Sequence, residues 1–349
     1  MSTKKLFYFL FALVFMFSSI AIAAKTQAKG TYTAGDKETF TGGSISFQMV
    51  YVPGGLTFPT GTDDKGNATV ADPYWIGETE VTYELWNKVY TWATANGYFF
   101  ANTGVKGSCG SGDVTQPATT INWRDAMVFS NALTEWYNAI KGTSYSCVYK
   151  VGDTPIRDSR DSNATQCDAV DQNTSAKGFR LLTSNEWELA ARYIGTTAPT
   201  MVPLDSEAIK TIINDATYYW TPGNHASGAG TNYMAIRRIM SKMTRKSPAT
   251  KDDKSVPPPT FNPTTEVAWY GKTGTQNVKK LRANQLGLYD MSGNVEEWCF
   301  DLTTFASFRV FRRGSWDNDA IGMQIGDRYY GDPFYANNRV GFRLARTAD

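Results

Sequence analysis

RVFRRGSWDNDAIGMQIGDRYYGDPFYANNRVGFRLAR, residues 309–346, is the stretch around which the rest of the chain is organised. Two regular segments, Arg312–Trp316 and Val340–Ala345, enclose a part rich in Asp, Asn, Gly and Tyr. Small polar residues suit turns, and tyrosine is a rigid amphipathic residue that binding surfaces favour. From Asp301 to Asp349 there is no Lys and no Glu, although long charged side chains usually solubilise surface loops. The pattern admits a loop between two core strands, but it favours a binding surface held on rigid flanks.

The N-terminus has the pattern of a secretory signal peptide, residues 1–23. Lys4 and Lys5 precede an apolar run from Leu6 to Phe17, and Ala21-Ile22-Ala23 follows. The apolar run is too short for a membrane-spanning helix. Removing the two lysines changes the formal charge from +2 to zero, which gives no electrostatic basis for binding nucleic acid or an anionic membrane. We therefore predict an exported protein of the periplasm, the outer surface or the medium, without a membrane-spanning segment in the mature chain.

The cysteine content permits disulfides in an exported chain. Four cysteines can pair in three ways, and Cys147 with Cys167 is the most local pair. Buried free thiols are the alternative. The spacing lacks a C-x-x-C pair, which argues against a zinc site. The four positions are Cys109, Cys147, Cys167 and Cys299.

Capping residues and hydrophobic periodicity predict the main helices and strands. Thr82 and Asn122 are suited to cap helices, and Thr183 with Glu186 forms a capping box. Alternation of apolar and polar residues indicates strands. The predicted elements are the strands Ile45–Val52 and Tyr74–Val81, and helices over Tyr83–Ala95, over Trp123–Ile140 with Gly142 ending it, and from the capping box to near Gly195.

The mature chain is predicted to hold one domain, residues 39–349, although its length alone would also admit two. Residues 24–38 are polar and are expected to be flexible. Residues from about 196 to 264 have weak periodicity and are expected to be an insertion, because recognisable motifs resume beyond them. Thr143–Ala176 is a polar excursion. The variable ligand-binding region is placed at about 310–346.

Five motifs, taken in order, carry a resemblance to a known family. They are GETEVT (77–82), RLLTSNEWELAAR (180–192), NQLGLYDMSGNVEEWCFD (284–301), RGSWDND (313–319) and NNRVGFRLAR (337–346). Together they resemble the formylglycine-generating enzyme, or sulfatase-modifying factor, family, from roughly Phe47 to Arg346. The resemblance implies an α+β, C-type-lectin-like fold of the formylglycine-generating enzyme type, with low regular secondary structure and long ordered loops.

The residues that perform this family's chemistry have no counterparts here. The cysteine-oxidising members hold copper with two closely spaced thiols, but Arg312–Arg346 contains no Cys. The related iron-dependent members need several histidines, and His225, expected in an exposed loop, is the only one. We therefore predict no catalytic residues, no catalytic cofactor and no enzymatic activity. The alternative is a formylglycine-generating-type oxidase of protein cysteine with another metal or thiol arrangement, although Cys299 is expected to be structural.

One branch of the family fits better: the variable proteins of diversity-generating retroelements, including those of Treponema. Their C-terminal stretch is rewritten by adenine-directed mutagenesis. AAC-type codons can become Asn, Asp, Tyr, Phe, Ile, Gly, Ala, Ser, Arg and a few other residues, but not Lys, Glu, Gln, Met or Trp. This accounts for the missing Lys and Glu. Met323 and Gln324 fall outside the permitted set and are expected to be fixed.

We therefore predict a receptor-like protein that binds an unknown protein or glycan through this region. A structural envelope protein without a specific ligand is a further alternative. Trp316 and Phe342 are expected in the core beneath the contacts. The predicted contacts are Asp317, Asn318, Asp319, Ile321, Gly322, Ile325, Tyr329, Tyr330, Asp332, Phe334, Tyr335, Asn337 and Asn338.

The turn Asp290–Glu297 resembles the segment where family members hold calcium through carboxylate and carbonyl oxygens. Hard oxygen ligands suit that ion. The resemblance implies Asp290, the carbonyl of Val295, and Glu297 as ligands of a structural calcium ion. A capped turn without metal is the alternative.

Overall fold

The computed structural model describes residues 32–199, 209–229, 263–303 and 307–348. The predicted signal peptide, the first residues of the polar segment, the basic run at 237–246 and the prolines at 257–259 lie outside these ranges. Mixed α/β structure with few helices and mostly small sheets makes up the described chain, as the predicted α+β class requires.

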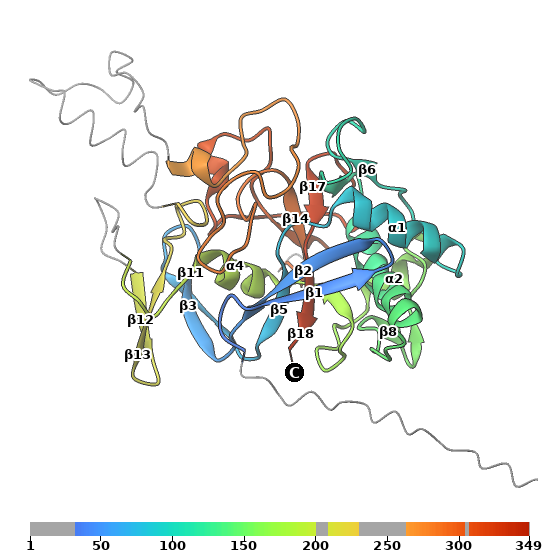
Figure 1. Cartoon of the computed structure of the whole chain (residues 1–349), viewed down its shortest axis with the longest axis horizontal. Helices are drawn as coiled ribbons and strands as arrows, with labels where there is room; N and C mark the ends of the chain where they lie inside the picture. Colours follow the sequence, from blue (N-terminus) through green and yellow to red (C-terminus); the bar gives the residue numbers. More distant parts are fainter. Residues whose placement is uncertain (1–31, 200–208, 230–262, 304–306, 349) are drawn as a thin grey trace, which may run out of the picture. The chain divides into compact units, whose positions relative to one another are not determined.

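The central sheet brings the two ends of the domain together. Its order is β1-β2-β5-β18-β10, and the C-terminal strand β18 lies antiparallel between β5 and β10. Figure 1 shows red β18 beside blue β5. The strands are β1 (Lys37–Gly42), β2 (Ile45–Val52), β5 (Tyr74–Gly77), β18 (Leu344–Thr347) and β10 (Phe179–Leu181).

The predicted flexible segment and one predicted strand end earlier than expected. The segment predicted to be flexible contains the start of β1, because Lys37 already pairs with Val50. The strand predicted to reach Val81 ends at Gly77, because the Val81 amide donates to the carbonyl of Phe342 outside this sheet, at 2.9 Å.

The central sheet separates two hydrophobic cores, because side chains alternate between its faces. In β5, Trp75 packs into one core whereas Tyr74 and Ile76 pack into the other. The first core is covered by α1 (Tyr83–Thr94) and α2 (Trp123–Lys141), and the second by α4 (Ser184–Arg192).

The helices begin where the capping residues predict. Thr82 caps α1, and Asn122 and Thr183 form capping boxes with Asp125 and Glu186. Gly142 ends α2 in a left-handed conformation, φ 67°, which glycine adopts without steric cost. The third predicted helix ends earlier than Gly195, because residues 193–195 form a strand that pairs with a later hairpin.

A second, four-stranded sheet carries the C-terminal motifs, in the order β16-β15-β14-β17. β14 is antiparallel to β15 and parallel to β17. Arg312 and Val340–Phe342, from the two regular segments of the sequence, thus lie on either side of β14. The strands are β14 (Glu296–Leu302), β15 (Arg309–Arg312), β16 (Arg328–Gly331) and β17 (Val340–Phe342).

Part of the predicted insertion belongs to the folded domain. Trp220 is 1% exposed and packs against Phe58 and Tyr193, with ring centroids 5.8 and 6.1 Å away. His225, predicted to be exposed, is 4% exposed. Aromatic burial therefore ties this segment to the second core. The strands here are β11 (Tyr193–Gly195), β12 (Ile209–Ile213) and β13 (Ala216–Trp220).

The remaining elements are short. They are β3 (Leu56–Thr60), β4 (Gly66–Val70), β6 (Val105–Lys106), β7 (Ala118–Thr119), β8 (Lys150–Val151), β9 (Thr154–Pro155), α3 (Ala164–Asp168), and the 3-10 helices η1 (Asp161–Asn163), η2 (Pro263–Glu266) and η3 (Ala320–Met323). Within the described ranges, no helix is long and apolar enough to cross a membrane.

Candidate ligand-binding surface

Main-chain hydrogen bonds hold the predicted variable region on the scaffold. The amide of Trp316 donates to the carbonyl of Asn294 at 2.9 Å, and that of Ile325 donates to the carbonyl of His225 at 3.0 Å. Near the other end, the amide of Thr120 donates to the carbonyl of Asn337 at 3.0 Å. Because these bonds use backbone atoms, they constrain the chain with any side chain except proline at the donor positions.

Large apolar side chains are exposed on this region. Ile321, Tyr329, Tyr330 and Phe334 have 43–58% of their surface accessible. The rings of Tyr329 and Tyr330 stack with centroids 5.4 Å apart, and the guanidinium of Arg313 lies 5.4 Å from the centroid of Tyr329. Clustered exposed aromatic residues are a common feature of interaction sites.

Three of the predicted apolar and aromatic contacts are buried or half-buried. Ile325 is 1% exposed and packs in the second core, and Gly322 is also buried. Tyr335 is half-buried against Trp298, with ring centroids 6.4 Å apart. The interpretation of Ile325 and Gly322 as surface contacts was wrong, because this irregular loop folds back onto the scaffold there. The prediction that Trp316 lies in the core was also wrong, because its side chain is half-buried.

The polar contacts predicted here divide into two groups. Five have side chains that hydrogen-bond within the protein and stabilise the loop: Asp317 to Arg339, Asn318 to Ser315, Asp319 to the start of η3, Asn337 to the amide of Arg339, and Asn338 to the carbonyl of Ser108. In contrast, no described residue donates a hydrogen bond to the carboxylate of Asp332, which is half-buried. Of these six residues, Asp332 is thus the one whose side chain makes no hydrogen bond to a described residue, so its whole carboxylate is available to a ligand.

A cavity of about 280 Å³ adjoins the exposed side chain of Phe334. Asp332 and Phe334 form one side of it, and scaffold residues form the rest. The sequence does not single out the scaffold residues, because they are distant in the chain and only the fold assembles them. They are Arg124, Asp168, Leu302, Ser307 and Arg309.

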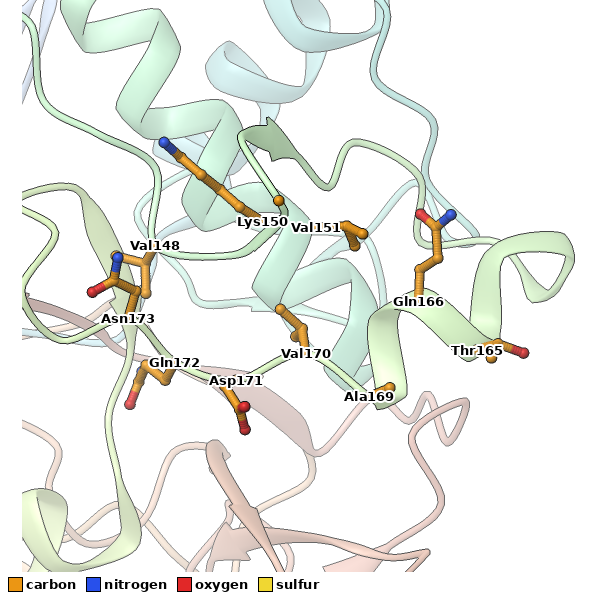
Figure 2. A pocket seen from close by; sticks show the side chains of 11 residues that line it. Val148, Lys150, Val151, Thr165, Gln166, Ala169, Val170, Asp171, Gln172 and Asn173 are labelled. Carbon is orange, nitrogen blue, oxygen red and sulfur yellow. The ribbon is translucent and has the colours of Figure 1, made fainter.

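A larger cavity, about 570 Å³, lies beside the β8–β9 hairpin and contains none of the predicted contacts. Figure 2 shows Val148, Val151 and Val170 among its lining side chains, with Gln166 and Asp171 around them. Its lining includes no aromatic side chain.

Glu296 is a titratable residue near the variable region that the sequence did not single out. Burial raises the pKa of its carboxyl to about 7, an effect that Arg339 and Arg313 oppose and that Asp317 and Asp327 reinforce. Glu296 begins β14, and its amide donates to the carbonyl of Arg339 at 2.8 Å.

This raised pKa predicts that stability depends on pH. Between the ordinary glutamate pKa of 4.5 and about 7, the native state holds more protons than the unfolded chain. The free energy of unfolding should therefore fall as pH rises through that window. Burial also raises the pKa of Asp290, to about 6, and adds to the same trend. Urea unfolding at several pH values measures it. Glu296→Gln should flatten the dependence, and Glu84→Gln at an exposed position should not.

The residues of the implied calcium site fit the ion only in part. Asp290 is 4% exposed, and its Oδ1 has no hydrogen-bond partner among the described residues. The carboxylate of Glu297, however, accepts hydrogen bonds from Arg343 and Trp187. In the described parts of the chain, no group of three or more His, Cys, Asp or Glu side chains is placed to hold a metal.

Calcium binding therefore stays a prediction that depends on Asp290 and backbone carbonyls. A bound ion should raise the melting temperature in calcium chloride relative to EDTA, and Asp290→Asn should abolish the rise. An unchanged melting temperature would leave this segment as a capped turn without metal.

The cysteines are free thiols, so the disulfide pairing of Cys147 with Cys167 is not formed. Their sulfurs contact different carbonyls instead, those of Asn131 and Asp158. Burial raises the pKa of both thiols to about 12 and that of Cys299 well above its ordinary value. A thiol held protonated is a poor nucleophile and metal ligand, which agrees with a structural role for Cys299.

Known proteins are similar to this chain in sequence and in fold. The model of the sulfatase-modifying factor enzyme 1-like domain (FGE-sulfatase) matches residues 41–348. Chaperone protein LppX of Paenibacillus barcinonensis is 26% identical over 323 residues, covering 87% of this chain and 91% of that protein. Among solved structures, Treponema denticola variable protein 1 is 28% identical with a TM-score of 0.57, over 89% of this chain and 99% of that one.

CarF, 23% identical with a TM-score of 0.55, covers 87% of this chain and 99% of its own and supports the fold alone. These similarities confirm the predicted C-type-lectin-like fold of the formylglycine-generating enzyme type. With the match spanning residues 41–348, the chain belongs to the sulfatase-modifying factor enzyme 1-like domain family.

Proposed function

We propose that this protein is an exported, non-enzymatic binding protein that presents a diversified ligand-contact surface. The observation that carries the proposal is the contrast within one region. Its backbone is tied to the scaffold by main-chain hydrogen bonds, whereas Tyr329, Tyr330 and Phe334 project into solvent. A preorganised backbone with exposed aromatic anchors limits the entropy lost on binding. The similarity to Treponema denticola variable protein 1 supports the same role.

Five positions of this region have the exposure expected from the permitted codon set. Ile321, Tyr329, Tyr330 and Phe334 are exposed and belong to the set that adenine-directed mutagenesis permits. Met323, outside that set, is 1% exposed. A buried methionine is a position at which random substitution would damage packing. These five positions fit diversification that spares the scaffold, whereas Gly322 and Ile325 belong to the permitted set and are buried.

Deep sequencing of this gene's 3′ end in a growing population tests the proposal. Substitutions should concentrate at adenines of codons within 317–338 and should spare Met323 and Gln324. The codons for 179–192, which encode β10 and α4, serve as an internal control. Substitutions spread evenly over both windows, or over all four bases, would reject diversification.

The alternative function is oxidation of protein cysteine, as the formylglycine-generating family name suggests. We expect the purified protein to lack this activity on a sulfatase-type cysteine peptide, with or without added copper, because Cys147, Cys167 and Cys299 are buried and Cys109 alone is exposed, whereas copper would be held by two closely spaced thiols. Mass spectrometry of the peptide detects the aldehyde product. Multiple turnovers per protein molecule would overturn the non-enzymatic proposal.

The name of the Paenibacillus barcinonensis relative describes a chaperone. A chaperone role would also be binding without catalysis, and it would require this chain to recognise a client protein. The localisation we propose, in the periplasm, on the outer surface or in the medium, follows from the expected signal peptide.

A further inference from the structure

The cavity beside Phe334 combines a constant wall with a variable one. The constant wall includes Arg124, 5% exposed, and Arg309, 2% exposed, and both are scaffold residues. The variable wall is the segment from Asp332 to Phe334. Changes in the variable segment would therefore alter one side of the cavity and leave the other side in place.

Several partners hold the two arginines of the constant wall, and its charged lining residues, Arg124, Arg309 and Asp168, carry one net positive charge. Arg124 binds Asp168 through two hydrogen bonds, of 2.8 and 2.7 Å. The guanidinium of Arg309 lies 3.7 Å from the centroid of the Trp123 ring, and it donates to the carbonyls of Phe300 and Asp168. Buried side chains held by several partners are preorganised for a ligand.

The variable wall offers an acceptor and an apolar face. The Asp332 carboxylate receives no hydrogen bond from the described residues, so both of its oxygens can accept from a ligand. Phe334 is 58% exposed and Leu302 is 50% exposed at the same cavity. A ligand that covers these side chains removes apolar area from water, which favours binding.

The charges of the lining side chains cancel. Arg124 and Arg309 contribute two positive charges, and Asp168 and Asp332 contribute two negative charges. An anionic ligand would meet the unpaired Asp332, and a fully apolar ligand would leave that carboxylate desolvated without a hydrogen bond, which is costly. The cavity therefore suits a neutral molecule that has hydroxyl groups on its edge and an apolar face.

A pyranose ring has these properties, since its hydroxyl groups both donate and accept and its C–H face can lie on an aromatic ring. A cavity of about 280 Å³ is below the size typical for drug-like ligands, which favours a single ring. We infer that this cavity binds one neutral sugar ring of a glycan, held between Asp332 and Phe334 on one side and the Arg309 wall on the other. The inference rests on the proposed binding function and names its ligand class.

Saturation-transfer NMR with the methyl glycosides of glucose, galactose and mannose tests this inference on the intact protein. At least one neutral glycoside should bind, with an affinity on the order of millimolar because a single ring offers few contact atoms. Phe334→Ala and Asp332→Asn should each weaken binding about tenfold or more, as loss of an anchor does. Melting curves should confirm that both variants remain folded.

Two controls make the result specific. Val151→Ala, at the other cavity, should leave binding unchanged. The methyl glycoside of glucuronic acid should bind less tightly than that of glucose, because its carboxylate would face Asp332. The inference is overturned if no neutral glycoside binds, if binding survives both cavity variants, or if the anionic glycoside binds more tightly.

Failure here is distinguishable from failure of the proposed function. Adenine-confined substitutions without sugar binding would leave a diversified surface for another ligand, such as a protein. Sugar binding without such substitutions would leave a lectin-like site that is not diversified.

Discussion

Phe342→Ala should lower the free energy of unfolding by about 3–5 kcal/mol, as truncation of a buried phenylalanine typically does. Phe342 is completely buried and packs against Trp86 and Phe129, with ring centroids 6.1 and 5.5 Å away. The same substitution at Phe334, eight positions earlier and 58% exposed, should change stability by no more than about 0.5 kcal/mol. Urea denaturation of the two variants measures the contrast.

This pair of variants shows whether the residues that stabilise the fold are distinct from those proposed to contact the ligand. A protein that tolerates diversification must keep its folding energy in the segments flanking the variable loop. If Phe334→Ala destabilised the protein as much as Phe342→Ala, the stretch around Phe334 would be core and the binding-surface proposal would fail.

Arg343→Met should also cost about 3–5 kcal/mol, because it removes one partner of a buried ion pair. Arg343 Nη2 lies 2.7 Å from Glu297 Oε1, and both side chains are at most 2% exposed. The substitution would leave the Glu297 carboxylate buried without a counter-charge. Thermal or chemical unfolding measures the loss.

Arg339→Met is the matched control, four residues away. Arg339 pairs with Asp317 at 2.8 Å, but the two side chains are 39% and 29% exposed. Pairs of this kind contribute about 0–1 kcal/mol. If the two arginine variants lost similar unfolding free energy, the buried scaffold pair would not be more important for stability than the exposed pair of the variable region.

The sequence by itself determined the elements that depend on local chemistry. Thr82, Asn122 and Thr183 begin their helices because a side-chain oxygen there accepts an amide hydrogen of the first turn. Alternation of apolar and polar residues located Ile45–Val52 as a strand, with no difference at either end. The family and its fold class also followed from motifs alone, because their order along the chain is specific.

Only the tertiary structure decided which residues of the irregular C-terminal loop are buried. Ile325 is more buried than predicted, and Trp316 is less buried than predicted. A loop has no periodicity from which burial can be predicted, so burial there depends on what packs over each side chain. The carbonyl of His225, a hundred residues earlier, holds the amide of Ile325. Likewise, sequence could not tell that Asn318 bonds inward whereas Asp332 keeps its carboxylate free, since a polar side chain's partner is chosen by the fold. The cavity beside Phe334 exists for the same reason: Arg124, Leu302 and Arg309 come from separate parts of the chain, and long-range packing alone brings them together.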